Sequence, residues 1–180
     1  MKIIYIIGIS FLFASCQSAS EPQLISVGNK FVDAFYSFKR DSLEKILSSA
    51  TGSQPEILYY QNWAECAQYK VLDRTHPFEI NDSTVLFPVT VKDDLVAALG
   101  STFNVTDTFH ITIRQGKIIS VTTSSNDLKA YYDAKAWVKK NRPEYIEKAC
   151  EGIWQGGPTP CECVLGMIKG FKEFTANTAK

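Results

Sequence analysis

The sequence predicts an α+β fold, in which helices from both ends of the chain pack with an antiparallel sheet formed by its middle. Three observations lead to this prediction. Apolar side chains recur every three or four residues up to Ala67, alternate with other residues between Val85 and Ser124, and return to the longer period from Ala130 onward. The chain is therefore divided into a helical, a strand and a second helical part.

The composition indicates a single globular domain without a charge bias. Of the 180 residues, 45% are apolar and 21% charged, which excludes a disordered tail or a fibre. The 19 Lys and Arg residues balance 19 Asp and Glu residues. Because affinity for nucleic acids depends on neutralising phosphates, no nucleic-acid partner is expected.

The N-terminus predicts export with a lipid anchor. After Lys2, the apolar run Ile3–Phe13 is too short to span a bilayer but fits the core of a signal peptide. Ala14-Ser15 then precedes Cys16, an order that resembles the lipobox of bacterial lipoproteins, whose cysteine is acylated and becomes the new N-terminus. Residues 1–15 are therefore expected to be the signal peptide and 16–21 a polar tether. The alternative is ordinary secretion with an accidental cysteine.

Acylation of Cys16 implies a membrane partner and a location in the cell envelope. Each buried methylene group contributes about 0.8 kcal/mol, so several acyl chains hold a protein on a membrane almost permanently. Gln17 follows Cys16, where an Asp marks inner-membrane retention in enteric lipoproteins. By this resemblance, the outer membrane is the expected destination.

The other four cysteines predict disulfides, because such bonds persist outside the cytosol. A bridge between Cys161 and Cys163 would close a very small ring. One of these two is therefore expected to pair with Cys150 and the other with Cys66. The alternative, a metal site, lacks the paired C-x-x-C spacing of zinc ligands, and no metal is expected.

Three helices are expected before the sheet, in residues 20–39, 41–47 and 53–67. The first carries its apolar residues on one face and begins with a capping box of Ser20 and Gln23. The third begins at Ser53 with Pro55 in its first turn, where proline is tolerated.

The middle of the chain predicts strands that end in a hairpin. Residues 70–80 are expected to form a strand, and Pro88 within the strand 85–91 indicates an edge or a bulge. The hairpin joins 106–114 to 117–124 through Gln115-Gly116, so Ile113 should face Ile118. Alternation then puts one set of residues on the face that receives the helices, namely Phe109, Ile111, Ile113, Ile118, Ser120 and Thr122. It leaves His110, Thr112, Arg114, Lys117, Ile119 and Val121 on the other face.

Three further helices are expected after the sheet. The first has its apolar stripe between Ala130 and Val138 and stops before Pro143. The second has a stripe from Ile146 to Ile153. The third opens with a capping box at Thr159–Glu162 and continues to Phe174.

This order of elements resembles the nuclear transport factor 2-like superfamily, and its SnoaL-like branch in particular. The clearest part is the hairpin Phe109-His110-Ile111-Thr112-Ile113-Arg114-Gln115-Gly116-Lys117-Ile118. The resemblance covers residues 22–125, and residues 126–180 are expected to be a helical extension of the same domain. It implies a cone-shaped fold, in which the sheet curves around the helices and leaves an open-ended cavity. Members of the superfamily use that cavity for different reactions or for binding, so the fold alone gives no function.

Aromatic side chains are the expected lining of this cavity. Tyrosine and tryptophan add a polar atom to an apolar ring, which suits an apolar ligand with one or two polar groups. The candidates are Tyr36, Tyr59, Trp63, Phe109, Tyr131 and Trp137. Alternatively, most of these rings fill the core, or the C-terminal helices plug the cavity with Trp154, Phe171 or Phe174.

Proton-transfer enzymes of this fold use a carboxylate base in an apolar cavity, and three residues are candidates for catalysis. They are His76, Asp73 and Asp107, all of which also fit ordinary loop or strand-end positions. The sequence contains no nucleophile elbow, phosphate-binding glycine loop or H-E-x-x-H helix. Serine-hydrolase, nucleotide-binding and metalloprotease functions therefore lose support.

The leading functional prediction is a lipid-anchored envelope protein whose non-catalytic domain binds a small apolar molecule or a protein. The alternative is a SnoaL-like isomerase, cyclase or hydrolase that acts on a small apolar substrate by general acid–base chemistry. A third prediction is a homodimer formed through the sheet face that carries Thr112. No cofactor is expected. An open cavity with a buried carboxylate near a Tyr or His would favour the enzyme, and a filled cone the interaction domain.

Overall fold

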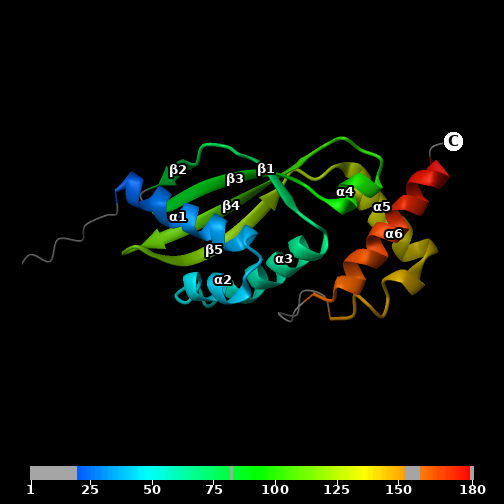
Figure 1. The fold of residues 1–180 in the computed structure, drawn as a ribbon, viewed down its shortest axis with the longest axis horizontal. Helices are drawn as coiled ribbons and strands as arrows, with labels where there is room; N and C mark the ends of the chain where they lie inside the picture. Colours follow the sequence, from blue (N-terminus) through cyan, green and yellow to red (C-terminus); the bar gives the residue numbers. More distant parts are fainter. Residues whose placement is uncertain (1–19, 82, 153–158, 179–180) are drawn as a thin grey trace, which may run out of the picture.

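The structure, a computed structural model, describes residues 20–81, 83–152 and 159–178. It is a mixed helix and strand fold with an antiparallel sheet, as the change of period predicts (Figure 1). The predicted signal peptide and the acylation site Cys16 lie outside the described residues. Among the residues that are described, no helix has the length and hydrophobicity needed to cross a membrane.

The helices before the sheet are α1 (Glu21–Tyr36), α2 (Arg40–Ile46) and α3 (Gln54–Cys66), close to their predicted ranges. The expected caps are not formed, because the Ser20 and Ser53 side chains make no capping hydrogen bond. The Ser53 hydroxyl instead accepts a hydrogen bond from the Val121 amide at 3.0 Å, which ties the start of α3 to the sheet. Gln61 is buried in α3, and its Nε2 donates to the carbonyl groups of Ala34 and Phe35 at the end of α1.

The strands are β1 (Lys70–Arg74), β2 (Phe78–Asn81), β3 (Thr84–Lys92), β4 (Val105–Arg114) and β5 (Lys117–Ser125). The sheet has the order β1-β3-β4-β5, and β2 pairs with the other half of β3. The single strand predicted over residues 70–80 is therefore two short strands that share one neighbour.

Pro88 explains why these two strands are separate. Along this side of β3, Arg74 of β1 is paired with Val89, and Phe78 of β2 is paired with Leu86. Pro88 lies between the two pairings and has its partner, Thr108, on the β4 side. Pro88 has no N–H group, and it lies at the point of β3 where pairing with β1 ends and pairing with β2 begins. The edge that proline predicts is therefore confined to this point of the strand.

The hairpin between β4 and β5 turns as predicted but changes register beyond the turn. Gln115 and Gly116 have φ angles of 51° and 71°, and Ile113 is paired with Ile118. The next pairing joins Thr112 to Ser120, because an extra residue on β5 forms a bulge. The bulge reverses the alternation, so the prediction that Ser120 and Thr122 share the covered face is wrong. Val121 takes that place and is 1% exposed.

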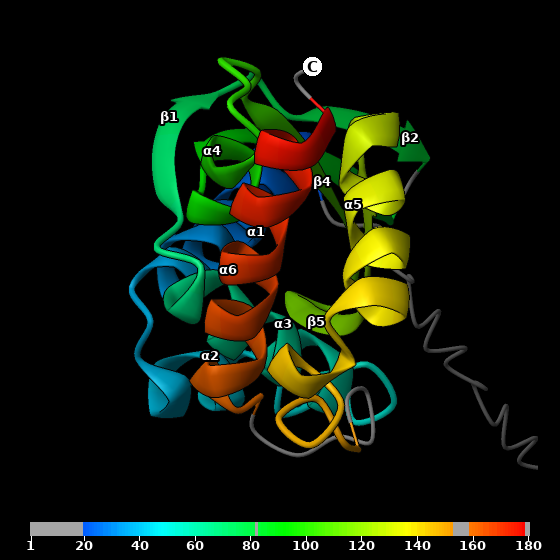
Figure 2. The ribbon, with the colours of Figure 1, turned by 90° about the vertical axis from the view of Figure 1, so that its right-hand side faces the viewer.

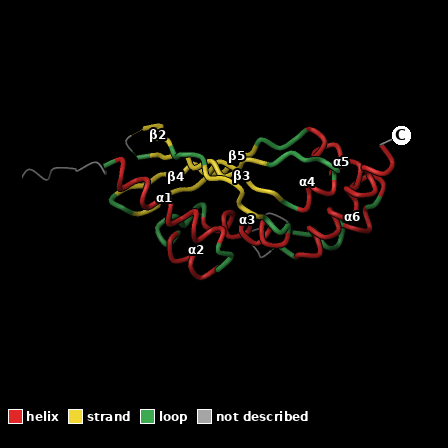
Figure 3. The backbone as a smooth tube through the Cα atoms, turned by 45° about the horizontal axis from the view of Figure 1, so that its top comes forward, coloured by secondary structure: helices red, strands yellow, loops and turns green. Residues whose placement is uncertain are grey.

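The helices cover one face of the sheet, and aromatic side chains fill the space between them. Phe31 and Phe35 of α1 contact Phe109 of β4, with ring centroids 5.2 and 4.9 Å apart. Gly28 lets α1 approach closely, since a Cβ atom there would lie 2.0 Å from the Phe87 ring. Figure 3 shows α2 and α3 on this side of the sheet. The other face carries the hydroxyl pairs Thr84–Thr112 and Thr90–Thr106, together with the half-buried residues Leu86 and Pro88.

The C-terminal part contributes α4 (Asp94–Ala98), α5 (Lys129–Asn141), the short 3-10 helix η1 (Pro143–Tyr145) and α6 (Cys161–Thr178). Helices α5 and α6 run side by side at one end of the sheet (Figure 2). Gly170 permits this contact, because a Cβ atom there would lie 2.3 Å from Cγ2 of Val138. Together with residues of α3 and α4, these helices form a second apolar cluster around Phe171 and Met167.

The helix predicted for residues 146–153 is absent up to Gly152, and Ile153 lies outside the described residues. Separate turns follow η1 there, and Gly152 has a φ angle of 74°. The helix predicted from Thr159 forms, but Thr159 does not cap it with its side chain. The Thr159 hydroxyl instead donates to the Tyr59 carbonyl group at 3.4 Å.

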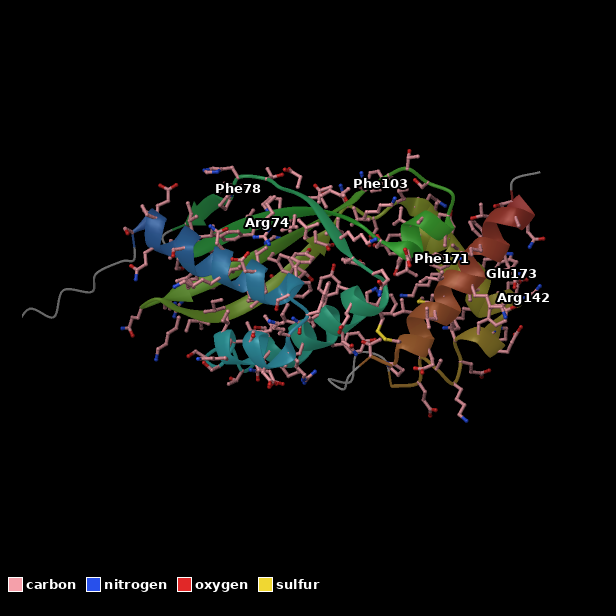
Figure 4. All side chains as sticks on the ribbon, viewed as in Figure 1. Arg74, Phe78, Phe103, Arg142, Phe171 and Glu173 are labelled. Atoms are coloured by element: carbon pink, nitrogen blue, oxygen red, sulfur yellow. A yellow bond between two sulfur atoms is a disulfide. The ribbon has the colours of Figure 1, made fainter. Side chains whose placement is uncertain are left out.

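Two disulfides connect the C-terminal segment, in agreement with the prediction. Cys66 is bonded to Cys161, and Cys150 to Cys163. The first joins the end of α3 to the start of α6, and Figure 4 shows a bridge between these helices. Further along α6, Glu173 accepts hydrogen bonds from Arg142 at 2.6 Å and from Tyr145 at 2.5 Å. The start and the end of α6 are therefore both fixed to preceding elements.

Candidate functional site

A pocket of about 290 Å³ lies where the end of the sheet meets the C-terminal helices. Helix α3 supplies Glu56, Ile57, Tyr60 and Trp63, and the sheet supplies Asp107 and residues 123–125. Tyr69, Asp93 and Asp127 line it from connecting segments. Helix α4 adds Leu95 and Val96, and α5 adds Tyr131, Tyr132 and Lys135. The predicted C-terminal extension thus builds part of the wall.

Asp107 is the most unusual residue of this pocket. It lies on β4 between Val89 and Ser125, on the same face as Phe109, and is 1% exposed. Its Oδ2 atom is buried and has no hydrogen-bond partner among the described residues. A buried polar atom without a partner costs about 1–3 kcal/mol, and more when it is charged. Oδ2 of Asp107 can therefore accept a hydrogen bond from a ligand in the pocket.

The environment of Asp107 raises the pKa of its carboxyl group to about 6. Burial is the main cause, because it penalises the charged form. The hydrogen bond from Tyr60 and the nearby Ser125 hydroxyl group lower the pKa, and the negative charges of Asp127 and Asp93 raise it. The group is therefore mostly ionised at pH 7 and titrates close to neutrality.

Tyr60 and Tyr69 form a chain of hydroxyl groups that ends at Asp107. A side-chain hydrogen bond joins the two phenols, and Tyr60 donates to the carboxylate. Their rings meet edge to face, with centroids 6.4 Å apart. Burial raises the pKa of both phenols well above the usual range, so both keep their protons and act as donors.

The neighbouring carboxylates have structural partners. Asp93 is 3% exposed, and its Oδ1 accepts the Val96 amide at 2.8 Å, which caps α4. Burial raises the pKa of Asp93. Asp127 accepts hydrogen bonds from Ser125 at 3.2 Å and from Tyr132 at 3.1 Å. Among the described carboxylates of the lining, Asp107 is the one with a buried oxygen that has no hydrogen-bond partner.

Of the predicted cavity residues, Trp63 and Tyr131 line the pocket. The other four do not line this pocket and lie in or against the two apolar clusters. Tyr36 at the end of α1 packs against Phe109 of β4 in the first cluster, with ring centroids 6.2 Å apart. Tyr59 is buried in the second cluster, and Trp137 packs against Phe174 at 6.1 Å.

Of the predicted catalytic candidates, only Asp107 lies in the pocket. His76 is exposed between β1 and β2, and Asp73 is exposed on β1 near the Thr75 hydroxyl. Among the rings expected to plug the cavity, Phe171 packs behind Tyr131 in an edge-to-face contact at 5.4 Å. Phe171 therefore supports the Tyr131 side of the pocket wall. Trp154 lies outside the described residues.

The sequence contains signals for the burial of Asp107, a predicted candidate, and for Tyr60, which was not predicted as a site residue. Asp107 is two residues before Phe109 and so shares its side of the strand, which places a carboxylate on the covered face. Tyr60 belongs to the apolar stripe of α3 with Ile57 and Ala64. Tyr69 and Asp93 come from connecting segments without a periodic pattern, and only the folded chain brings them together.

This site can bind a small ligand through a carboxylate and two phenol groups, and it can transfer a proton near neutral pH. In the described part of the chain, no three His, Cys, Asp or Glu side chains are grouped so that they could hold a metal ion.

No protein-family model, curated protein or solved structure matches this chain.

Proposed function

We propose that this chain is a lipid-anchored envelope protein whose folded domain binds a small molecule in the pocket between α3, β4 and α5. The observation that carries the proposal is the buried Oδ2 atom of Asp107, which lines the pocket and lacks a partner among the described residues. A ligand that donates a hydrogen bond to it removes the cost of that unpaired atom. Trp63 and Tyr131 supply apolar surface for the rest of the ligand.

The proposed domain is a SnoaL-like cone. The three helices that precede the sheet and cover one of its faces support this proposal. So does the position of the pocket at the end of the sheet, with the C-terminal helices beside it.

Binding can be tested with 2-phenylethanol, a neutral probe with one ring and one hydroxyl group, by saturation-transfer NMR on the domain without residues 1–16. The proposal predicts a saturation-transfer signal for the probe with wild type. A bulky side chain at the rim of the pocket should abolish that signal. Ser125→Trp is the test variant, because Ser125 lines the pocket. Thr122→Trp is the control, since Thr122 is exposed on the opposite face of the same strand. No signal, or a signal unchanged by Ser125→Trp, would contradict the proposal.

The lipid anchor has a separate test. Growth of the expressing bacterium with an alkyne-tagged fatty acid should label the protein, and Cys16→Ser should abolish the label. Ser18→Ala is the control, because Ser18 lies in the proposed tether. A wild-type protein that takes up no label would overturn the anchor and leave the pocket proposal intact.

A second candidate function is proton-transfer catalysis, and the pKa of Asp107 near 6 favours it. In this reaction Asp107 takes a proton from the carbon beside a carbonyl group. Because the protonated carboxyl group no longer attracts the Tyr60 hydroxyl strongly, Tyr60 turns its O–H from Asp107 to the oxygen that becomes negative, while Tyr69 keeps its hydrogen bond to Tyr60. Deuterium exchange at the α carbons of cyclohexanone in D₂O, followed by mass spectrometry, tests this step. Wild type should exchange faster than buffer and Asp107→Asn should not. Equal rates for wild type and buffer would exclude this activity for the ketone.

A further inference from the structure

We propose that the ligand of this pocket is a small organic amine, bound as its ammonium ion with Asp107 as the counter-ion. This inference rests on the proposed binding function and adds the charge class of the ligand. It follows from three features of the pocket: the sign of its charge, the free oxygen of Asp107 and the aromatic wall.

The charge of the lining favours a cation. Glu56, Asp93, Asp107 and Asp127 line the pocket, and Lys135 is the basic residue among the lining side chains of the described chain. Lys135 is exposed, whereas Asp93 and Asp107 are buried. Because charges interact more strongly away from bulk water, an anionic ligand would meet repulsion from the buried carboxylates and a cation would meet attraction.

The hydrogen-bond pattern directs the cation to one oxygen. Asp93 caps α4, and Asp127 is held by Ser125 and Tyr132. Oδ2 of Asp107 is the buried carboxylate oxygen that has no partner in the described structure. An ammonium group offers several N–H donors, and a charge-assisted hydrogen bond to a carboxylate is about twice as strong as a neutral one.

The aromatic wall distinguishes an organic cation from a metal ion. Tyr60, Trp63, Tyr69 and Tyr131 line the pocket, and aromatic rings attract ammonium groups while giving apolar contact to the attached carbon chain. The described carboxylates are not grouped as a metal site requires. The volume of about 290 Å³ is at the lower end of ligand pockets, which indicates a small amine.

The test compares three probes of similar size at pH 7.5: 2-phenylethylamine, 2-phenylethanol and 3-phenylpropanoate. Dissociation constants come from NMR titrations of wild type, Asp107→Asn and Asp133→Asn. Asp133 is the control, because it is an acidic residue of α5 that pairs with Lys129 outside the pocket. The proposal predicts that the amine binds wild type at least tenfold more tightly than the alcohol and that the carboxylate does not compete. Asp107→Asn should remove that preference, and Asp133→Asn should keep it.

A second readout needs no variant. Lowering the pH from 7.5 to 5 protonates Asp107 and should weaken binding of the amine at least fivefold, with little effect on the alcohol. The polar and charged groups that interact with Asp107 are Tyr36 of α1, Tyr60 of α3, Tyr69, Asp93 before α4, Ser125 of β5 and Asp127 before α5. The amine itself stays protonated over this range.

The outcomes separate the two proposals. If the amine and the alcohol bind equally well and Ser125→Trp removes both, the pocket stands and the amine inference is wrong. A carboxylate probe that binds better than the amine would also overturn it. If none of the three probes binds, both proposals fail.

Discussion

The Tyr60 hydroxyl group of α3 donates a hydrogen bond to the Asp107 carboxylate of β4, and the other oxygen of that carboxylate is left without a partner among the described residues. The contact joins the helical layer to the sheet at the floor of the pocket. The Asp107 carboxylate is buried and charged, and burying it costs free energy that other interactions of the fold must offset. Sites that bind or react commonly keep such groups at the expense of stability.

Asp107 should make the folded protein less stable as the pH rises. Its pKa rises from 3.8 to about 6 on folding, so the native state holds the extra proton between these values. Stability from this group is therefore complete below about pH 4 and is lost as the pH passes 6. The shift corresponds to on the order of 3 kcal/mol. Urea unfolding of wild type and Asp107→Asn at pH 4 and pH 7.5 measures it. The loss of free energy of unfolding between these pH values should be smaller in the variant, and equal losses would contradict the buried, titrating carboxylate.

The two disulfides should contribute unequally to stability. Cys66 and Cys161 are 95 residues apart, and Cys150 and Cys163 are 13 apart. In the chain-entropy description, closing a loop of the first size stabilises by about 5 kcal/mol and one of the second size by about 3 kcal/mol. We expect the pair of substitutions Cys66→Ala and Cys161→Ala to lower the midpoint of thermal unfolding more than Cys150→Ala with Cys163→Ala. The reverse order would show that the longer loop is already restricted in the unfolded chain.

Gly166→Ala should destabilise the contact between α6 and the short helix η1. A Cβ atom at Gly166 would lie 2.0 Å from the carbonyl oxygen of Tyr145, which is a backbone atom and cannot rotate away. The gain in helix propensity is about 1 kcal/mol, and overpacking costs about 1–3 kcal/mol or more. Chemical unfolding should therefore show a net loss. Gly52→Ala is the control, because no atom lies within 4 Å of a Cβ there. A Gly166→Ala protein as stable as the Gly52→Ala control would mean that α6 moves freely against η1.

A homodimer through the outer sheet face is the remaining structural prediction. This face carries Thr112 and Thr84, whose hydroxyl groups are 3.3 Å apart. Thr112→Glu would bring two like charges together across a two-fold axis and should dissociate the dimer. Ser26→Glu on the exposed side of α1 is the matched control. Sedimentation of the domain without its acylation site measures the mass, and a monomeric wild type would rule out this interface.

Local patterns predicted the elements whose structure depends on neighbouring residues. The Gln115-Gly116 turn follows from a glycine between two alternating segments, and α1, α2, α3, α5 and α6 follow from their apolar stripes. The bulge on β5 has no local signal, because Ile119 fits a regular strand equally well. It nevertheless decides that Val121 rather than Ser120 faces the core. An error of one residue in register therefore exchanges the two faces of the strand.

The candidate site was less predictable, because it is assembled from segments far apart in the chain. Asp107 could be named as a candidate from its residue type, but its burial depends on the contact with Tyr60 across the core. Tyr69 and Asp93 belong to connections for which no periodic pattern exists. By contrast, the disulfide pairing was limited to a few choices by ring size, and one of the expected arrangements is present.

The most direct test of the central claim is the titration of the Asp107 carboxyl carbon by NMR, with and without 2-phenylethylamine. A pocket built around this carboxylate predicts a pKa of about 6 in the free protein. The bound amine should lower that pKa clearly, because a nearby positive charge favours the ionised form. A free-protein pKa close to the ordinary Asp value, with no change on adding the amine, would contradict the claim that Asp107 is the buried anchor of a ligand pocket.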